Sequence, residues 1–291
     1  MRKKRSPFPL LLILAVLLAG MAWWLQERQM HRPPLQKPPG EGGLKKERTI
    51  SPPPTIPRPE GVEKELGVPS GAERIAIIID DLGYNGENYR PFLEMGRPLT
   101  FAILPALPYS QRIANEAIGQ GREVLLHLPL EPHGYPLKNP GRGVILSSMS
   151  EEEMRRILFE DLKSIPGAVG VNNHMGSRLM EDREAMRVLL SELKRKNLYF
   201  VDSLTTNRTT ALVLAKELGV KMGARGIFLD NYQDRAYIEG QLKALAQLAR
   251  KKGGAIGVGH PYAVTASVLK DRLPELEKEG IHLVPASHLV Q

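Results

Sequence analysis

Acidic and histidine side chains occur at the ends of several short apolar segments of this sequence. These residues are Asp80 and Asp81 after Ile75–Ile79, His127 within Val124–Leu128, His174 after Ala168–Val171, Asp202 after Tyr199–Val201, and His260 after Ala255–Val258. Imidazole nitrogens and carboxylate oxygens bind divalent metals such as Zn²⁺, and a site with three protein ligands keeps a position for water. Gathered at one place, these residues predict a metal site.

Each of these residues also has a purely structural explanation. An Asp-Asp pair such as Asp80-Asp81 often caps the next helix, and Asp202-Ser203 is compatible with the start of a helix near Thr209. A single histidine at a strand end is more often a packing residue than a ligand. A common site is favoured because such residues lie at the same end of five of these segments.

The apolar segments alternate with amphipathic helices from residue 74 onward. Ile75–Ile79 is apolar throughout, which is typical of a strand buried on both faces of a parallel sheet. Ser150 and Glu153 form a capping-box pattern at a helix start, and Gly253-Gly254 marks a helix end. The alternation predicts an α/β fold with a parallel sheet, open or closed into a barrel, whose functional residues gather at the carboxyl ends of the strands.

Other elements are expected around these. The remaining strands are expected at Leu99–Leu104, Val220–Met222 and His282–Val284. Residues 129–149 contain four prolines and three glycines, and we expect them to loop over one end of the sheet. His133, His282 and His288 are interpreted as loop or surface residues.

Composition excludes several classes of site. The chain has no cysteine, so disulfides, thiolate zinc sites and cysteine nucleophiles are absent. Of its 40 Lys/Arg and 32 Asp/Glu residues, 12 and 6 lie in the first 70 positions, which leaves the remainder nearly neutral. No basic stripe indicates a nucleic-acid partner.

The first 70 residues differ in kind from the rest. Residues 2–5 are basic and precede an apolar run of 18 residues from Phe8 to Leu25, which is near the lower limit for crossing a bilayer. Residues 1–30 are therefore predicted to be a signal anchor of the cytoplasmic membrane, with a cleaved signal peptide as the alternative. Residues 31–70 are predicted to be a Pro-rich linker and residues 71–291 a single domain on the periplasmic or extracytoplasmic side.

Five motifs carry a resemblance to a known family. They are Ile79-Asp80-Asp81, Leu126-His127-Leu128-Pro129, Asn172-Asn173-His174-Met175-Gly176-Ser177, Asp202-Ser203 and Gly257-Val258-Gly259-His260-Pro261. From residue 74 to 290 the chain resembles the divergent polysaccharide deacetylases, a branch of the NodB-homology carbohydrate esterases. The resemblance implies a distorted (β/α) barrel of about seven strands.

The resemblance also implies a role for each motif. Asp80 matches the general base, Asp81 a metal ligand and His260 the general acid. The family's paired histidines lie four residues apart, whereas His127 and His133 lie six apart, so we expect His127 and His174 to complete the metal site. Asn172, Asn173, Asp202 and Ser203 are expected to bind substrate. The substrate-orienting arginine of the superfamily is missing from the strand end that Asn172-Asn173-His174 occupies.

The expected function is metal-dependent hydrolysis, by a zinc-type site, of the amide bonds of an N-acetylated envelope polysaccharide such as peptidoglycan. The altered histidine spacing and missing arginine leave an alternative, a catalytically weak domain that binds glycan or partner proteins in cell-wall maintenance. A third alternative is a metal-dependent hydrolase of another acyl or phosphoryl bond.

Overall fold

The computed structural model describes residues 72–291, and the predicted membrane segment and linker lie outside the described residues. Within residues 72–291, no helix is both long and apolar enough to span a membrane. The strands are β1 (Glu73–Leu82), β2 (Thr100–Ile103), β3 (Glu123–Leu130), β4 (Gly170–Met175), β5 (Tyr199–Asp202), β6 (Met222–Phe228), β7 (Gly254–Gly259) and β8 (Ile281–Leu283). The helices are α3 (Arg90–Glu94), α4 (Ser110–Gly119), α5 (Glu151–Ser164), α6 (Arg183–Arg195), α7 (Ala211–Leu218), α8 (Arg235–Lys252) and α9 (Ala263–Lys278), with short 3₁₀ turns η1 (Leu179–Glu181) and η2 (Ala286–His288).

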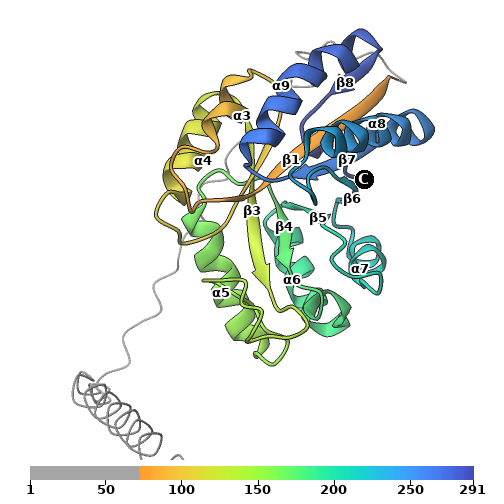
Figure 1. Ribbon diagram of the computed structural model, residues 1–291. Helices are drawn as coiled ribbons and strands as arrows, with labels where there is room; N and C mark the ends of the chain where they lie inside the picture. The colour runs from red at the N-terminus through yellow and green to blue at the C-terminus, as the bar shows by residue number, and fades with distance from the viewer. Residues whose placement is uncertain (1–71) are drawn as a thin grey trace, which may run out of the picture. The chain divides into compact units, whose positions relative to one another are not determined.

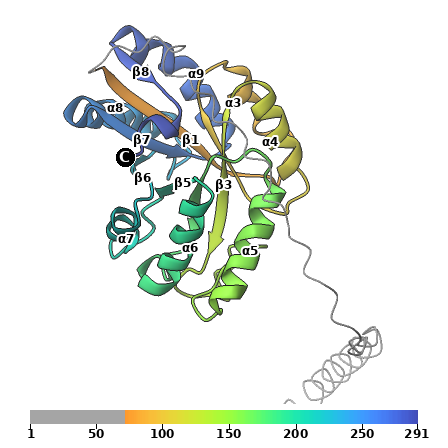
Figure 2. The same cartoon turned by 180° about the vertical axis from the view of Figure 1, so that it is seen from behind.

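Seven parallel strands close into a barrel. They follow chain order from β1 to β7, and β1 pairs with both β2 and β7 to complete the ring. The helices lie outside the ring of strands (Figure 1), and the view from behind shows the same arrangement (Figure 2). Because all the strands are parallel, their carboxyl ends open at one mouth. The predicted distorted (β/α) barrel of about seven strands is confirmed.

The eighth strand, β8, lies outside the ring of seven and pairs with β1. β1 pairs with β8 through Glu73–Ile75 and with β2 only from Ile78 onward, on the same side. β8 therefore pairs with the first residues of β1, at the end of the barrel opposite the mouth.

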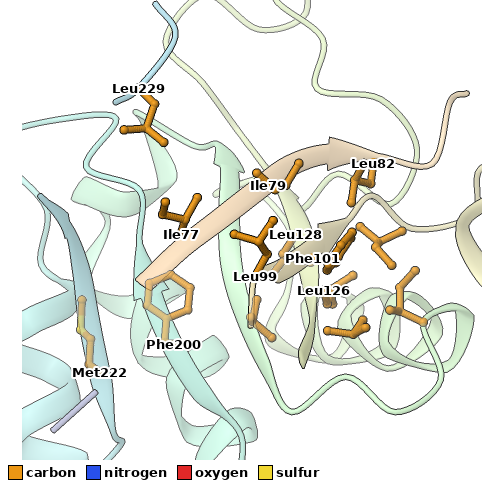
Figure 3. Close-up of a cluster of buried hydrophobic side chains, with 14 of the residues drawn as sticks. Ile77, Ile79, Leu82, Leu99, Phe101, Leu126, Leu128, Phe200, Met222 and Leu229 are labelled. Carbon is orange, nitrogen blue, oxygen red and sulfur yellow. The ribbon is translucent and has the colours of Figure 1, made fainter. Parts of the chain in front are cut away.

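Alternate residues of each strand face opposite sides, so the barrel has an outer and an inner core. The outer core packs between strands and helices, and Figure 3 shows part of it, including Ile77, Ile79 and Phe101. The inner core joins residues of non-adjacent strands, namely Ala76, Ile78, Ala102, Leu125, Tyr199, Val201, Ile256 and Val258. The next inward positions toward the mouth are Asp80 in β1 and His127 in β3, and His260 directly follows β7.

The chain end packs against the inner core at the end opposite the mouth. Ala286, Leu289 and Val290 contact the inner core, and Gln291 exchanges two backbone hydrogen bonds with Met222 of β6. Figure 1 marks the C-terminus beside β6 and β7. These residues form the floor of the barrel.

The helix boundaries follow the expected capping chemistry. Ser150 caps α5 in a reciprocal capping box with Glu153, Asp182 caps α6, and α8 ends at Gly253 in a left-handed conformation. One strand differs from expectation, since β6 begins at Met222, where the predicted segment Val220–Met222 ends. The rest of β6 contains the polar Arg225 and two glycines, so it lacks the apolar run from which a strand is predicted.

Candidate metal centre

A bulge at the end of β1 turns two consecutive aspartates toward one site. Adjacent residues of a regular strand point to opposite faces, so Asp80 and Asp81 would normally diverge. The β1–β2 register shifts between Ile79 and Leu82, and Asp81 has a left-handed φ of 58°. Bulges of this kind re-aim a side chain next to functional sites. As a result, Asp80 faces the barrel interior and Asp81 turns into the mouth, where both approach His127.

Three side-chain atoms of Asp81, His127 and His174 converge at the mouth. Asp81 Oδ1 lies 3.1 Å from His127 Nε2 and 2.9 Å from His174 Nδ1. The two ring nitrogens lie 3.2 Å apart. Asp81 is partly exposed and His127 is buried. Within the described residues, these three side chains form the group of His and acidic residues that could hold a metal ion.

The donor set fits a divalent cation. Zinc–ligand distances of about 2.0–2.2 Å, at tetrahedral or octahedral angles, separate neighbouring ligand atoms by about 2.8–3.6 Å. The three separations between Asp81, His127 and His174 agree with that spacing. One carboxylate and two imidazoles suit zinc and similar transition metals, and three protein ligands leave positions for water and substrate.

The charges of the three ligands support the same interpretation. The hydrogen bonds and charges of His127 and His174 outweigh burial and hold the pKa of Asp81 well below its usual range. Burial lowers the pKa of His127, but Asp80 and Asp81 outweigh it and raise that pKa above its ordinary value. A concentration of negative charge therefore faces the imidazole nitrogens, as a cation site requires.

Asn172 lies behind the ligands. Its Oδ1 is 2.9 Å from His127 Nδ1, and its Nδ2 donates to Asp80 Oδ1 at 2.8 Å. Asn172 and Asp80 are both buried. Burial raises the pKa of Asp80, against the lowering effect of His127 and His260.

His260 is paired with an aspartate from the neighbouring strand end. His260 Nδ1 lies 2.8 Å from Asp230 Oδ1, and Asp230 Oδ2 accepts from the His260 backbone N–H and from Thr265 Oγ1. Burial lowers the pKa of His260, but the hydrogen bond and charge of Asp230 outweigh it and raise that pKa to about 9. His260 Nε2 points toward Asp81, with 3.8 Å to Asp81 Oδ2. An imidazolium therefore faces the metal ligands.

The remaining predicted site residues lie beside this centre and hold loops. Asn173 accepts from the Ser203 backbone N–H and donates to the Met175 carbonyl. Asp202 accepts from the Leu204 backbone N–H and from Thr209 Oγ1. Asn173, Asp202 and Ser203 are all buried. Their assignment to substrate binding, like that of Asn172, stays a prediction. His133 lies on the rim, where its Nε2 is 3.3 Å from Glu181, and it takes no part in the cluster.

Two bulky apolar residues stand at the mouth in strained conformations. Met175 ends β4 and Leu204 lies two residues after the end of β5; their left-handed φ values are 53° and 48°, and both side chains are partly exposed. Such conformations cost about 1–2 kcal/mol for residues with a Cβ. Asn173 donates to the Met175 carbonyl and Asp202 accepts from the Leu204 backbone N–H, and these two bonds hold the conformations in place.

Sequence reasoning missed two residues of this site. Asp230 follows the Phe228-Leu229 stretch, where an aspartate is also compatible with a helix cap, and it is the partner of His260. Arg225 donates to the carbonyls of Ser203 and Leu204, and its guanidinium lies 3.8 Å from the ring centre of Phe228. The available signal for Arg225 was a charged residue between two glycines, shortly before the apolar Ile227 and Phe228.

The chain is similar in sequence and in fold to known proteins. A sequence profile of the family described as divergent polysaccharide deacetylase matches residues 77–290. The uncharacterized protein YibQ of Escherichia coli K12 is 38% identical over 226 residues, 77% of this chain and 70% of that protein. An uncharacterized protein of Haemophilus influenzae Rd is 38% identical over 216 residues, 74% of this chain and 76% of that protein. The solved structure of uncharacterized protein ATU2773 from Agrobacterium tumefaciens C58 superimposes with a TM-score of 0.73 at 27% identity, covering 75% of this chain and 89% of that one.

Proposed function

The chain belongs to the divergent polysaccharide deacetylase family, and we propose that it is a metal-dependent amide hydrolase that removes acetyl groups from an N-acetylated envelope polysaccharide. The observation that carries this proposal is the convergence of Asp81, His127 and His174 beside the His260–Asp230 pair. We propose Zn²⁺ as the metal, held by those three side chains. When bound, a divalent cation supplies Lewis acidity that polarises a carbonyl and acidifies water.

The two titratable groups that flank the ligands suit opposite roles in proton transfer. Asp80 Oδ1 is occupied by Asn172, which leaves Oδ2 to accept a proton from water during attack on the amide. His260, with a pKa of about 9, is an imidazolium at neutral pH and can protonate the departing amine. The products are acetate and a free amino sugar.

Asp230 keeps His260 in the form that this role requires. Its Oδ1 accepts from His260 Nδ1, which directs the other ring nitrogen, Nε2, toward the metal ligands. Asp230 is buried and fixed by Thr265, so the orientation of the imidazole is set before substrate binds.

We further propose that the domain acts outside the cytoplasmic membrane, with peptidoglycan as the candidate glycan and residues 1–30 as the anchor. The basic residues before the apolar run support this orientation. Protease treatment of intact spheroplasts should degrade the domain. Protection of the domain until the cells are lysed would contradict the proposed location.

The hydrolase proposal is tested by metal content and by amide hydrolysis. Purified protein should hold about one zinc per chain and release acetate from oligomers of N-acetylglucosamine. His127→Ala and His174→Ala should lose both properties. His282→Ala, which changes a histidine of β8 at the other end of β1, should keep both. If the unmodified protein binds no zinc, or binds zinc but hydrolyses no acylated glycan, the proposal fails and the glycan- or partner-binding alternative gains support.

A further inference from the structure

Asn172 is a neutral side chain that bridges Asp80 and the proposed metal ligand His127. Among the described residues it is the one neutral side chain that does so. It donates to Asp80 and faces His127 Nδ1. We propose that Asn172 is a positioning residue that ties the proton acceptor Asp80 to the metal ligand His127, and that it does not contact substrate. The inference rests on the proposed function and adds a role for Asn172 that the family membership does not supply.

The register of the sheet brings Asn172 to His127. The two residues are direct partners in the parallel β3–β4 pair. Asp80 lies on β1, which is not a hydrogen-bonded neighbour of β4. The Asn172–Asp80 bond therefore crosses the barrel interior, above the apolar inner core. Asn172 is fully buried, so its amide meets protein groups on both sides.

An amide is the side chain that satisfies both neighbours. Asp80 as a carboxylate only accepts hydrogen bonds, whereas His127 as a metal ligand through Nε2 carries its hydrogen on Nδ1 and must donate it. Asn172 offers a donor to Asp80 and an acceptor to His127 at 2.8 and 2.9 Å. Residues that fix the free nitrogen of a ligating histidine typically contribute ~10–100-fold to metal affinity.

Three variants separate this role from substrate binding. Asn172→Ala and Asn172→Leu remove both hydrogen bonds, and the leucine also fills the volume in case the alanine variant does not fold. Asn172→Asp keeps the acceptor for His127 but sets a second carboxyl group against Asp80. Zinc affinity is measured by competition with a chelating dye, and circular dichroism checks the fold. Asn173→Ala is the matched control, because Asn173 is an equally buried neighbour whose side chain bonds to Met175, Ser203 and Thr205 and to neither Asp80 nor His127.

The proposal predicts a definite order of affinities. Asn172→Ala and Asn172→Leu should weaken zinc binding by ~10–100-fold, while Asn172→Asp and Asn173→Ala should stay within about threefold of the unmodified protein. For Asn172→Asp, kcat should fall with KM unchanged, because Asp80 then faces another carboxyl group.

Other results would overturn it. Unchanged zinc affinity in Asn172→Ala or Asn172→Leu, with a raised KM, would make Asn172 a substrate-binding residue. An equal loss in Asn173→Ala would indicate general loosening of β4. Absence of zinc binding in the unmodified protein would also remove the proposed role. Zinc binding in the predicted order without any hydrolysis would leave this inference standing and refute the proposed function alone.

Discussion

Replacing Asp230 with asparagine should remove the charge that keeps His260 protonated. The pKa of His260 is about 9, compared with an ordinary value of 6.5. The difference corresponds to about 3 kcal/mol in favour of the imidazolium. Burial lowers the pKa of His260, and in Asp230→Asn only the weaker influence of Asp80 and Asp81 opposes burial. We therefore expect the pKa of His260 to fall by about two units or more.

NMR of the imidazole Cε1–H in the metal-free protein measures this change without any substrate. At pH 8 a group with a pKa near 9 is about 90% protonated, and one with a pKa of 6.5 is about 3% protonated. Asp271→Asn is the control, because Asp271 is an exposed acid of α9 that pairs with Arg235. A His260 pKa that stays within about half a unit in a folded Asp230→Asn variant would refute the assignment of Asp230 as its partner. The alkaline limb of the activity profile should shift to lower pH in the same variant.

Three further predictions concern stability. Burial raises the pKa of Asp161 to about 8, and one of its carboxyl oxygens has no hydrogen-bond partner. The folded state therefore keeps a proton that the unfolded state releases near pH 4, so Tm should fall between about pH 4 and 8. Asp161→Asn should flatten this dependence of Tm on pH, and a profile parallel to that of the unmodified protein would contradict the prediction. Gly170→Ala should lower the free energy of unfolding in urea by about 1–3 kcal/mol, because the new Cβ would lie 2.8 Å from the Tyr199 ring. Gly240→Ala has open space around it in α8 and should raise the free energy of unfolding by about 0.5–1 kcal/mol. Equal effects of the two substitutions would contradict the prediction. Zinc at a hundred times its Kd should stabilise the protein by about 2.7 kcal/mol, reversed by a chelator, and an unchanged Tm would argue against the metal centre.

The sequence predicts the elements whose signals are local. The apolar run Ile75–Ile79 and the Ser150 capping box each depend on a few neighbouring residues, and both are confirmed. β6 is different. Ile256 and Leu248 pack so close to Gly223 and Gly226 that these positions have no room for an apolar side chain, and the strand therefore lacks an apolar pattern. Packing between distant segments determines those positions.

The same distinction holds for the site. Asp81, His127 and His174 could be grouped because parallel strands end at one mouth, and their atoms do converge. The bulge that turns Asp81 could not be predicted, since it depends on the pairing of β1 with β2. Nor could the Asp230–His260 bond, which joins residues 30 positions apart on neighbouring strand ends.

The closure of the barrel has a consequence for synthesis. β1 closes the ring against β7 and also pairs with β8 near the end of the chain, so the first described strand depends on the last two. A ribosome releases β1 about 180 residues before its partner β7, which leaves a long apolar strand with an unpaired edge during translation. Nascent chains arrested before the final residues should therefore remain sensitive to protease and engage chaperones, and resistance should appear only when the whole domain has emerged.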